Sequence, residues 1–337
     1  MFLSILIACR NETQHLIETI RSIRQTVPSD KIEIIVVDDA SVPTIDSAAL
    51  DKAAPGPPPT LLITLPTRRG VADARHIAAQ RAHSNWLLLT DSHMIFEPGW
   101  LQAFERAAAT TPDPTRTLFC GPFLASCTQF EDSIPRHDPV DFWDTHFYYW
   151  LRKPAGDVEI LTWRSVSRAP PADSNPYEVQ CVNGANYFCT RDWFLHVGGL
   201  PCFLGWCGIS ELFLSMKTWL AGGSVRLIPD LRLRHILHKT NLGQNGYGKD
   251  TGHEQLLYNK LAAAYQLFPE QLYHQFVGAL PCGRNDERLT WALRKLDARR
   301  DELDYWRRYV ARHLVHDHDW LCAKFDLDHP ADLGAVV

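Results

Sequence analysis

Short continuous runs of apolar residues alternate with stretches of helical spacing along the first 95 residues of the chain. Four runs end in polar or turn residues, which is typical of buried strands; they cover residues 2–9, 32–37, 61–65 and 86–90. Apolar residues at helical spacing follow the first run, and residues 71–82 are rich in small residues. This order predicts an α/β fold with a mostly parallel sheet and helices on both faces.

The rest of the chain is predicted to be irregular at first and then mainly helical. Residues 110–176 are rich in proline and aromatic residues, and the aromatic cluster at 142–150 is either the lining of a groove or an amphipathic helix. Residues 239–253 are polar and glycine-rich, which predicts a loop that closes over a ligand. Further elements are expected as strands at 187–189 and 225–228, a helix at 211–221, and helical structure at 254–315 with a break at 283–286.

Charge and cysteine content narrow the class of protein. The 337 residues include 34 Lys and Arg and 39 Asp and Glu, and the net charge of −5 argues against phosphate-neutralising binding of nucleic acid. Nine cysteines without a C-x-x-C pair argue against a zinc ribbon and a disulfide framework. No stretch reaches the roughly 18–20 apolar residues of a membrane span. No secretory signal precedes Arg10, so a cytoplasmic location is expected.

Polar residues follow three of the predicted strands at the point where each strand ends. Arg10-Asn11-Glu12 follows the first strand, Asp38-Asp39 the second and Asp91-Ser92-His93 the fourth. The carboxyl ends of parallel strands meet at one edge of an open α/β sheet, which is where such sheets bind ligands. The alternative is that each aspartate caps the helix that follows it. Three polar strand ends at one edge favour a binding site.

Asp91 and His93 are the candidate metal ligands at this edge. Side chains two residues apart in an extended segment lie on the same side of it. A carboxylate oxygen and an imidazole nitrogen together suit Mn²⁺ or a similar divalent ion. Such an ion can bridge a diphosphate and neutralise the charge of a departing nucleotide. A D-x-H triplet occurs often by chance, so it needs support from other residues.

Asp91-Ser92-His93 resembles the metal-binding motif of the polypeptide N-acetylgalactosaminyltransferases, a glycosyltransferase family with the GT-A fold that is related to the broad family-2 transferases. Other segments of residues 1–268 resemble that family in the same order. They include its first strand and polar loop at 7–12, its V-D-D-x-S element at 37–41, its G-x-x-x-x-R segment at 70–75, its small-residue turn at 183–185, its tryptophan–glycine block at 205–223, its histidine element at 234–236 and the following helix at 258–265.

The resemblance implies a GT-A fold over residues 1–268, with a nucleotide-binding half at 1–110 and an acceptor and catalytic half at 111–268. A helical C-terminal extension would follow at 269–337. Because the lectin domain and membrane anchor of the family have no counterpart, a soluble, stand-alone enzyme is expected. Ile209-Ser210-Glu211 replaces a glycine and acidic pair of the family, so one carboxylate remains there.

The resemblance also implies roles for individual residues. Asp91, His93 and His235 would bind Mn²⁺ or another divalent ion, with His238 a weaker candidate. From its residue type rather than the resemblance, Glu211 would be the catalytic carboxylate that deprotonates the acceptor in an inverting transferase; a retaining enzyme of the resembled family needs no clear protein base, and the alternative is that Glu211 only begins a helix. The UDP-sugar would be contacted by Ala8, Arg10, Glu12, Asp38, Asp39, Arg75, Asp91, Ser92, Asn183, Gly184 and Trp206.

Four of these roles have structural alternatives. Asp38 and Asp39 could form a turn, with at least one of them contacting the nucleotide. Arg75 could pair with a helix carboxylate instead of the diphosphate. Trp206 could pack in the core instead of stacking on a sugar or on the nucleotide.

The function implied is metal-dependent transfer of a sugar, an N-acetylhexosamine, from a UDP-sugar to an acceptor that the sequence does not identify. The acceptor is a peptide, a glycan or a small molecule. Glu211 favours inversion of the configuration at the anomeric carbon of the transferred sugar, whereas the resemblance favours its retention. The alternatives are a nucleotide-sugar-binding protein without turnover and a metal-dependent hydrolase using Asp91, His93 and His235. No nucleic-acid partner is expected, and residues 269–337 would serve acceptor binding or assembly of a homo-oligomer.

Overall fold

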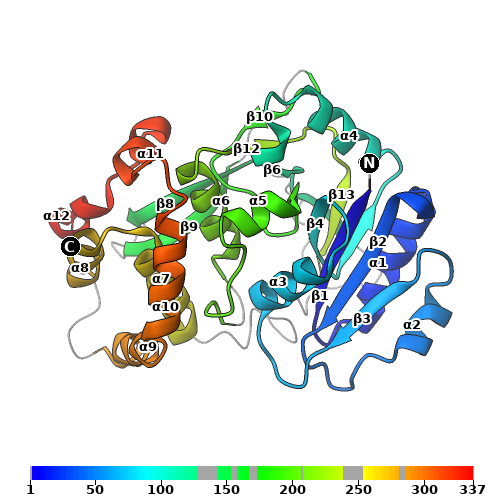
Figure 1. Cartoon of the computed structure of the whole chain (residues 1–337), viewed down its shortest axis with the longest axis horizontal. Helices are drawn as coiled ribbons and strands as arrows, with labels where there is room; N and C mark the ends of the chain where they lie inside the picture. Colours follow the sequence, from blue (N-terminus) through cyan, green and yellow to red (C-terminus); the bar gives the residue numbers. More distant parts are fainter. Residues whose placement is uncertain are drawn as a thin grey trace.

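An eight-stranded sheet runs through the molecule (Figure 1). The computed structural model describes residues 2–127, 143–152, 158–166, 173–205, 208–237, 253–280 and 286–336. The strands of the sheet are β1 Leu3–Cys9, β2 Ile32–Asp38, β3 Thr60–Thr64, β4 Trp86–Asp91, β6 Thr117–Cys120, β10 Tyr177–Glu178, β11 Asn186–Thr190 and β12 Ser224–Leu227. Their order across the sheet is β10-β12-β6-β11-β4-β1-β2-β3. The four strands predicted early in the chain are therefore confirmed, each within one residue of its expected ends.

Parallel pairing prevails in the half of the sheet formed by β1 to β4. β1 lies between β2 and β4 and is parallel to both, and β3 is parallel to β2 at the edge. The direction changes beyond β4, because β11 is antiparallel to both β4 and β6. All seven residues of β1 are buried, which a strand covered on both faces requires and which explains why all of them but Ser4 are apolar. The predicted α/β sheet is confirmed.

Helices cover both faces of the sheet. The sheet therefore lies between two apolar layers of the core, one on each face. These helices are α1 Thr13–Thr26, α2 Ser47–Ala53, α3 Val71–Arg81, α4 Trp100–Thr110, α5 Arg191–His196 and α6 Ser210–Leu220. Leu16 of α1 and Trp100 of α4 belong to one layer. Ala74 of α3 and Leu212 of α6 belong to the other. The small residues of α3 let this helix pack closely on the sheet, so the alanine-rich composition has a structural reason.

The aromatic cluster expected as a helix or a groove lining is instead part of a strand. β8 Asp144–Arg152 pairs antiparallel with β9 Val158–Val166. Phe147 and Tyr149 are buried, whereas Tyr148 and Trp150 are only half-buried. Burial that alternates every second residue identifies a strand, so the helix prediction was wrong, as was the irregular structure expected for β6, β8 and β9. Residue 142 lies outside the described part of the chain.

A small three-stranded sheet lies next to the carboxyl end of β4. It consists of β5 Met94–Phe96, β13 Leu233–Leu237 and β7 Leu124–Cys127, with β13 in the centre. β13 is antiparallel to β5 and parallel to β7. Because β5 follows β4 after only two residues, this sheet brings residues near 235 to the end of the central strand.

Helices from the C-terminal part of the chain complete the core on the side of β8 and β9 (Figure 1). They are α7 His253–Leu267, α8 Glu270–Gly278, α9 Glu287–Ala298, α10 Arg300–Ala311, α11 His318–Phe325 and α12 Leu333–Val336. Leu296 and Leu303 belong to the same apolar layer as α3 and α6, so these helices share one core with the sheet. The helical C-terminal region is confirmed. Among the described helices, none has the length and apolar character needed to cross a bilayer.

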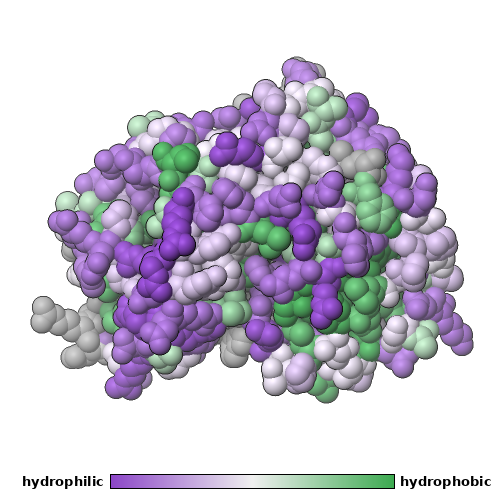
Figure 2. Space-filling view, viewed as in Figure 1, coloured by the Kyte–Doolittle hydropathy of each residue, from purple (hydrophilic) through white to green (hydrophobic). Residues whose placement is uncertain are grey.

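The edge strand β3 leaves apolar side chains at the surface. None of its five residues is fully buried, and Leu61 is 45% exposed. Figure 2 shows a mainly polar face with an apolar area low on the right, where α3 and β3 lie in the same view. Exposure on one side is expected for a strand that pairs on one edge only.

We predict that Leu296→Ala lowers the free energy of unfolding by about 2–5 kcal/mol, because it leaves a cavity in the shared core. Leu296 is 2% exposed, whereas Leu293 on the same helix is 37% exposed. Chemical denaturation should therefore show a change of about 0.5 kcal/mol or less for the matched variant Leu293→Ala. Equal effects of the two substitutions would contradict the packing of α9 on this core.

Candidate functional site

The ends of β1, β2 and β4 meet at one edge of the sheet, as the sequence predicted. In the strand register, Ala8 is paired with Asp91 and Cys9 with Asp38. The amide of Asp39 donates to the carbonyl of Cys9 over 2.9 Å, which joins the segments that follow β1 and β2. The polar residues after the three strands are therefore neighbours in space.

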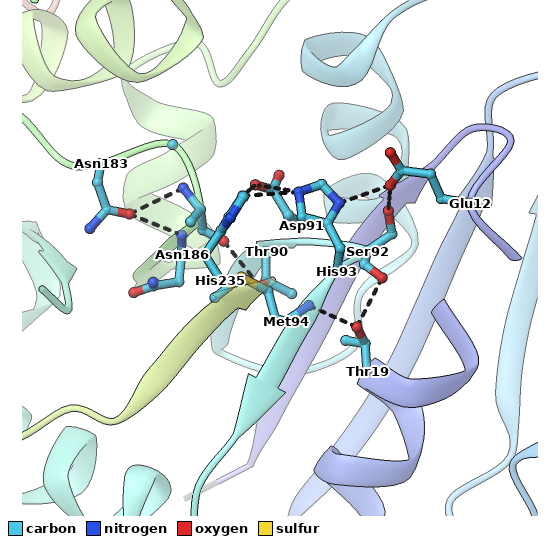
Figure 3. A network of polar contacts seen from close by, with 12 residues as sticks. Glu12, Thr19, Thr90, Asp91, Ser92, His93, Met94, Asn183, Asn186 and His235 are labelled. Atoms are coloured by element: carbon cyan, nitrogen blue, oxygen red, sulfur yellow. Dashed lines mark hydrogen bonds and ion pairs between the residues drawn. The ribbon is translucent and has the colours of Figure 1, made fainter. Parts of the chain in front are cut away.

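Asp91, His93 and His235 converge at this edge (Figure 3). The Nε2 atoms of His93 and His235 are 2.9 Å apart. Asp91 Oδ2 lies 3.7 Å from His93 Nε2 and 3.5 Å from His235 Nε2. His235 reaches this position because β13 pairs with β5, which places it opposite Met94. The amide of Ile236 donates to the carbonyl of His93 over 2.9 Å.

This donor set fits a divalent metal ion. Two ligands at right angles with bonds of about 2.1 Å would be roughly 3 Å apart, which is close to the spacing of the two imidazole nitrogens. One carboxylate oxygen and two imidazole nitrogens suit Mn²⁺ or a similar ion. Two nitrogen lone pairs cannot face each other at 2.9 Å without a proton or a cation between them. The sequence-based grouping of these three residues thus agrees with their geometry.

A buried arginine pairs with Asp91 on the side away from the imidazoles. Arg75 is 1% exposed, and its Nη2 donates to Asp91 Oδ1 over 2.7 Å and to the carbonyl of Gly184 over 3.1 Å. Its Nη1 donates to the hydroxyl of Tyr187 over 3.0 Å. The carboxylate partner expected for Arg75 therefore exists, but it lies at a strand end and not on a helix.

The charges around Asp91 keep it ionised. Burial by itself would raise the pKa of Asp91, but the hydrogen bond with His235 and the positive charge of Arg75 outweigh it and lower the pKa to about 2. Oδ1 is bonded to Arg75 and Oδ2 faces the two imidazoles. Asp91 can therefore offer a charged oxygen to a cation at neutral pH.

Glu12 contacts the opposite side of His93. Its Oε2 accepts hydrogen bonds from His93 Nδ1 and from the hydroxyl of Ser92, each over 2.8 Å (Figure 3). Burial would raise the pKa of Glu12, but the hydrogen bond from His93 lowers it overall. Burial would likewise lower the pKa of His93, but the bond to Glu12 and nearby negative charge raise it. The hydroxyl of Thr19 accepts from the amide of Met94 and donates to the carbonyl of Ser92, each over 2.9 Å.

The carboxylates of Asp38 and Asp39 stabilise the loops at the same edge. Asp38 accepts hydrogen bonds from the amides of Ser41 and Ile45, over 2.9 Å and 3.1 Å. Asp39 accepts from the amides of Arg69 and Gly70, over 2.6 Å and 2.9 Å. Both aspartates are fully buried. The turn expected as an alternative is therefore present, and a nucleotide contact of either residue stays a prediction.

Asn183 and Gly184 form the turn that separates Arg75 from Glu211. Asn183 donates to the carbonyl of Gly121 over 2.6 Å and accepts from the amide of Ala185 over 3.1 Å. A Cβ atom on Gly184 would lie 2.7 Å from Glu211 Oε1, so a larger residue there would displace the Glu211 side chain. Glu211 is in the first turn of α6 and thus lies beside the group of residues that supports Asp91.

C-terminal helices contact the turn that precedes α6. Asn259 of α7 donates to the carbonyl of Gly205 over 2.8 Å and accepts from its amide over 3.0 Å. Arg299 at the start of α10 donates to the carbonyl of Cys202 over 3.2 Å. A Cβ atom on Gly205 would lie 2.6 Å from Gln255 Nε2. These helices therefore hold the segment at 202–205 in place.

The remaining predicted residues are placed as follows. Ala8 is 4% exposed within β1, and Arg10 is half-buried just beyond it. Trp206 and His238 lie outside the described residues, as does nearly all of the expected loop at 239–253. Sequence reasoning missed Tyr187 and Thr19, because a tyrosine within a strand and a threonine within a helix carry no motif. Their role depends on the residues that folding brings to them.

The comparisons with known proteins agree with this fold. Residues 4–117 match the family model described as glycosyl transferase family 2. Human polypeptide N-acetylgalactosaminyltransferase 15 is 29% identical over 234 residues, 66% of this chain and 33% of the relative. Polypeptide N-acetylgalactosaminyltransferase 8 of Drosophila melanogaster is 27% identical over 272 residues, 76% of this chain and 42% of the relative. The chain thus spans less than half the length of these relatives.

Two solved structures establish the class of fold. GalNAc-T7, crystallised with UDP, GalNAc and Mn²⁺, has a TM-score of 0.70 at 17% identity over 96% of this chain and 57% of that one. S. aureus TarS 1-349 in complex with UDP-GlcNAc has a TM-score of 0.55 at 11% identity over 93% of this chain and 88% of that one. The fold is therefore the GT-A fold of glycosyltransferases. The resemblance to the polypeptide N-acetylgalactosaminyltransferases and to family-2 transferases, expected from the motifs, is confirmed.

We predict that Asp91→Ala lowers the free energy of unfolding by about 3–5 kcal/mol at neutral pH, because it leaves the Arg75 guanidinium buried without its anion. The matched control is Asp230→Ala, which removes the carboxylate of an exposed pair with Arg106 and should cost about 1 kcal/mol or less. Denaturant titration of the metal-free protein measures both. A cost for Asp91→Ala no greater than that of the control would contradict the proposed importance of the buried pair.

Proposed function

We propose that this chain is a metal-dependent glycosyltransferase that transfers an N-acetylhexosamine from a UDP-sugar to an acceptor. The observation that carries the proposal is the convergence of Asp91, His93 and His235 at the carboxyl edge of a GT-A sheet. Open α/β sheets bind their ligands at this edge. The similarity to transferases of N-acetylgalactosamine, and to structures crystallised with UDP or UDP-GlcNAc, supports the class of donor.

Asp91, His93 and His235 would bind Mn²⁺ or another divalent ion. Such an ion, when bound, supplies positive charge that stabilises the diphosphate as it leaves the sugar. Arg75 keeps one oxygen of Asp91 engaged, so the other faces the imidazoles. Ligands held in place by the fold need little rearrangement to bind the ion.

Residues 1–110 would form the nucleotide-binding half and 111–268 the acceptor and catalytic half. The donor contacts are proposed for the residues at the carboxyl edge and for the turn at 183–184. Residues 269–337 would contribute to acceptor binding or to a homo-oligomer. The cytoplasmic location expected from the sequence stays a prediction.

Glu211 is proposed to contact the acceptor hydroxyl. It is the acidic residue in the first turn of α6 and lies against Gly184, whose carbonyl accepts from Arg75. A carboxylate at this point can orient the hydroxyl or take its proton in an inverting transfer. Its contact with the turn beside Asp91 is what supports a position near the reacting sugar.

A thermal-shift series with UDP-, GDP-, dTDP- and CDP-sugars tests the class of donor. We expect stabilisation by a UDP-N-acetylhexosamine with Mn²⁺, and loss of that stabilisation with EDTA. A ligand that binds only the native state at a hundredfold excess over Kd stabilises it by about 2.7 kcal/mol. Stabilisation by no nucleotide sugar under either condition would contradict the proposal.

Two substitutions separate donor binding from turnover. His93→Ala should abolish the Mn²⁺-dependent part of UDP binding, because it removes one of the three ligands, as calorimetry would show.

Glu211→Gln should leave UDP affinity within about twofold and lower the release of UDP from the donor by about 10²–10⁴-fold, if Glu211 takes the proton. A wild-type protein that binds the donor but never releases UDP with any acceptor would be a binding protein. Metal affinity that is the same with and without UDP would favour the hydrolase alternative.

A further inference from the structure

The two imidazoles of the candidate metal site are linked to Glu12 by a chain of hydrogen bonds. Glu12 is acceptor-only when ionised, so the 2.8 Å contact requires a proton on His93 Nδ1. In neutral His93, Nε2 then carries a lone pair directed toward Asp91 and His235. The 2.9 Å contact between the two Nε2 atoms requires one proton, and while His93 is neutral that proton is on His235 Nε2.

The two histidines are consequently not equivalent before a cation binds. His93 already presents a bare nitrogen, whereas His235 must move its proton from Nε2 to Nδ1 to become a ligand. His235 Nδ1 is buried, and no hydrogen-bond partner contacts it among the residues that the structure describes. The ring of His235 packs instead on Phe123, with centroids 5.0 Å apart. Moving a proton to that nitrogen places an unsatisfied donor in an apolar contact, which costs free energy.

The charges near the site give Glu12 a second effect. Asp91, Glu12 and Arg75 are the charged side chains that act on His93. Arg75 forms an ion pair with Asp91 over 2.7 Å, so its charge offsets that of the metal-binding carboxylate. Glu12 adds a second negative charge beside the imidazoles, on the side of His93 away from Asp91. Its side chain is only 12% exposed, so water screens this charge weakly.

We propose that Glu12 is a positioning residue that presets His93 as the first metal-binding nitrogen and adds a negative charge beside the imidazoles. This inference rests on the proposed function, because it requires that the site binds a metal ion. It gives Glu12 a role other than direct contact with the nucleotide. A carboxylate that accepts from a metal-binding imidazole fixes the orientation of the ring and strengthens its bond to the ion.

Metal binding by the full chain without nucleotide tests the proposal. Calorimetry with Mn²⁺, and the visible absorption of bound Co²⁺, report affinity and coordination independently of turnover. Glu12→Gln keeps an oxygen that accepts from His93 but removes the charge, and Glu12→Ala removes both. We expect each variant to bind either ion about 10–100-fold more weakly than the wild type, with the larger loss in Glu12→Ala.

Glu33→Gln is the matched control for removal of a half-buried, hydrogen-bonded carboxylate. Glu33 accepts from the hydroxyls of Ser4 and Ser84 and from the amide of His83, in β2 near the opposite end of the sheet. Its substitution should leave metal affinity within about twofold of the wild type. If Glu12→Ala does not fold, Glu12→Asp keeps the charge but shortens the side chain, and it should still weaken metal binding through loss of the bond to His93.

The outcomes separate this inference from the proposed function. A wild-type chain that binds neither Mn²⁺ nor Co²⁺ would overturn both. Wild-type binding together with affinity within twofold for folded Glu12→Gln and Glu12→Ala would overturn the role of Glu12 alone. Nitrogen-15 NMR of histidine-labelled, metal-free protein gives an independent result: we expect a proton on Nδ1 of His93 and on Nε2 of His235. The reverse assignment would also overturn it.

Discussion

The ion pair between buried Arg75 and half-buried Asp91 is the interaction on which the geometry of the site depends. Arg75 comes from α3, Asp91 ends β4, and the same guanidinium contacts Tyr187 of β11 and the carbonyl of Gly184. Taking both charges out of water is costly unless their geometry and further hydrogen bonds compensate. The pair is therefore stable in one arrangement of these three elements, and that arrangement directs Asp91 Oδ2 toward the imidazoles.

Polar side chains at the edge of the sheet serve two purposes that sequence patterns do not separate. Asp38, Asp39 and Asn183 satisfy backbone groups of the loops, whereas Asp91 and His93 leave atoms directed toward one another. The first group makes the second possible, because loops with satisfied amides keep a defined shape. The proposed donor site needs both, because binding groups on mobile loops would pay a cost in entropy when a ligand orders them.

The C-terminal helices are part of the same structural unit as the sheet. Leu296 and Leu303 belong to the core layer that includes α6, and Asn259 and Arg299 contact the turn before that helix. The sequence predicted helices there but not their structural role. They cover apolar surface of α6 and β9, and they contact the segment that precedes α6.

Local sequence determined the early strands and helices, the polar strand ends and the D-x-H triplet, because these depend on patterns within a few residues. The prediction from local sequence was wrong for β8, because the mixed spacing of its aromatic residues did not indicate the alternating burial of a strand. Tertiary structure decided that His235 meets His93, since 142 residues separate them and only the register of β13 on β5 joins them. It also decided that Arg75 pairs with Asp91 and that Glu12 contacts His93. Such contacts are set by how distant elements pack, and no local pattern encodes that geometry.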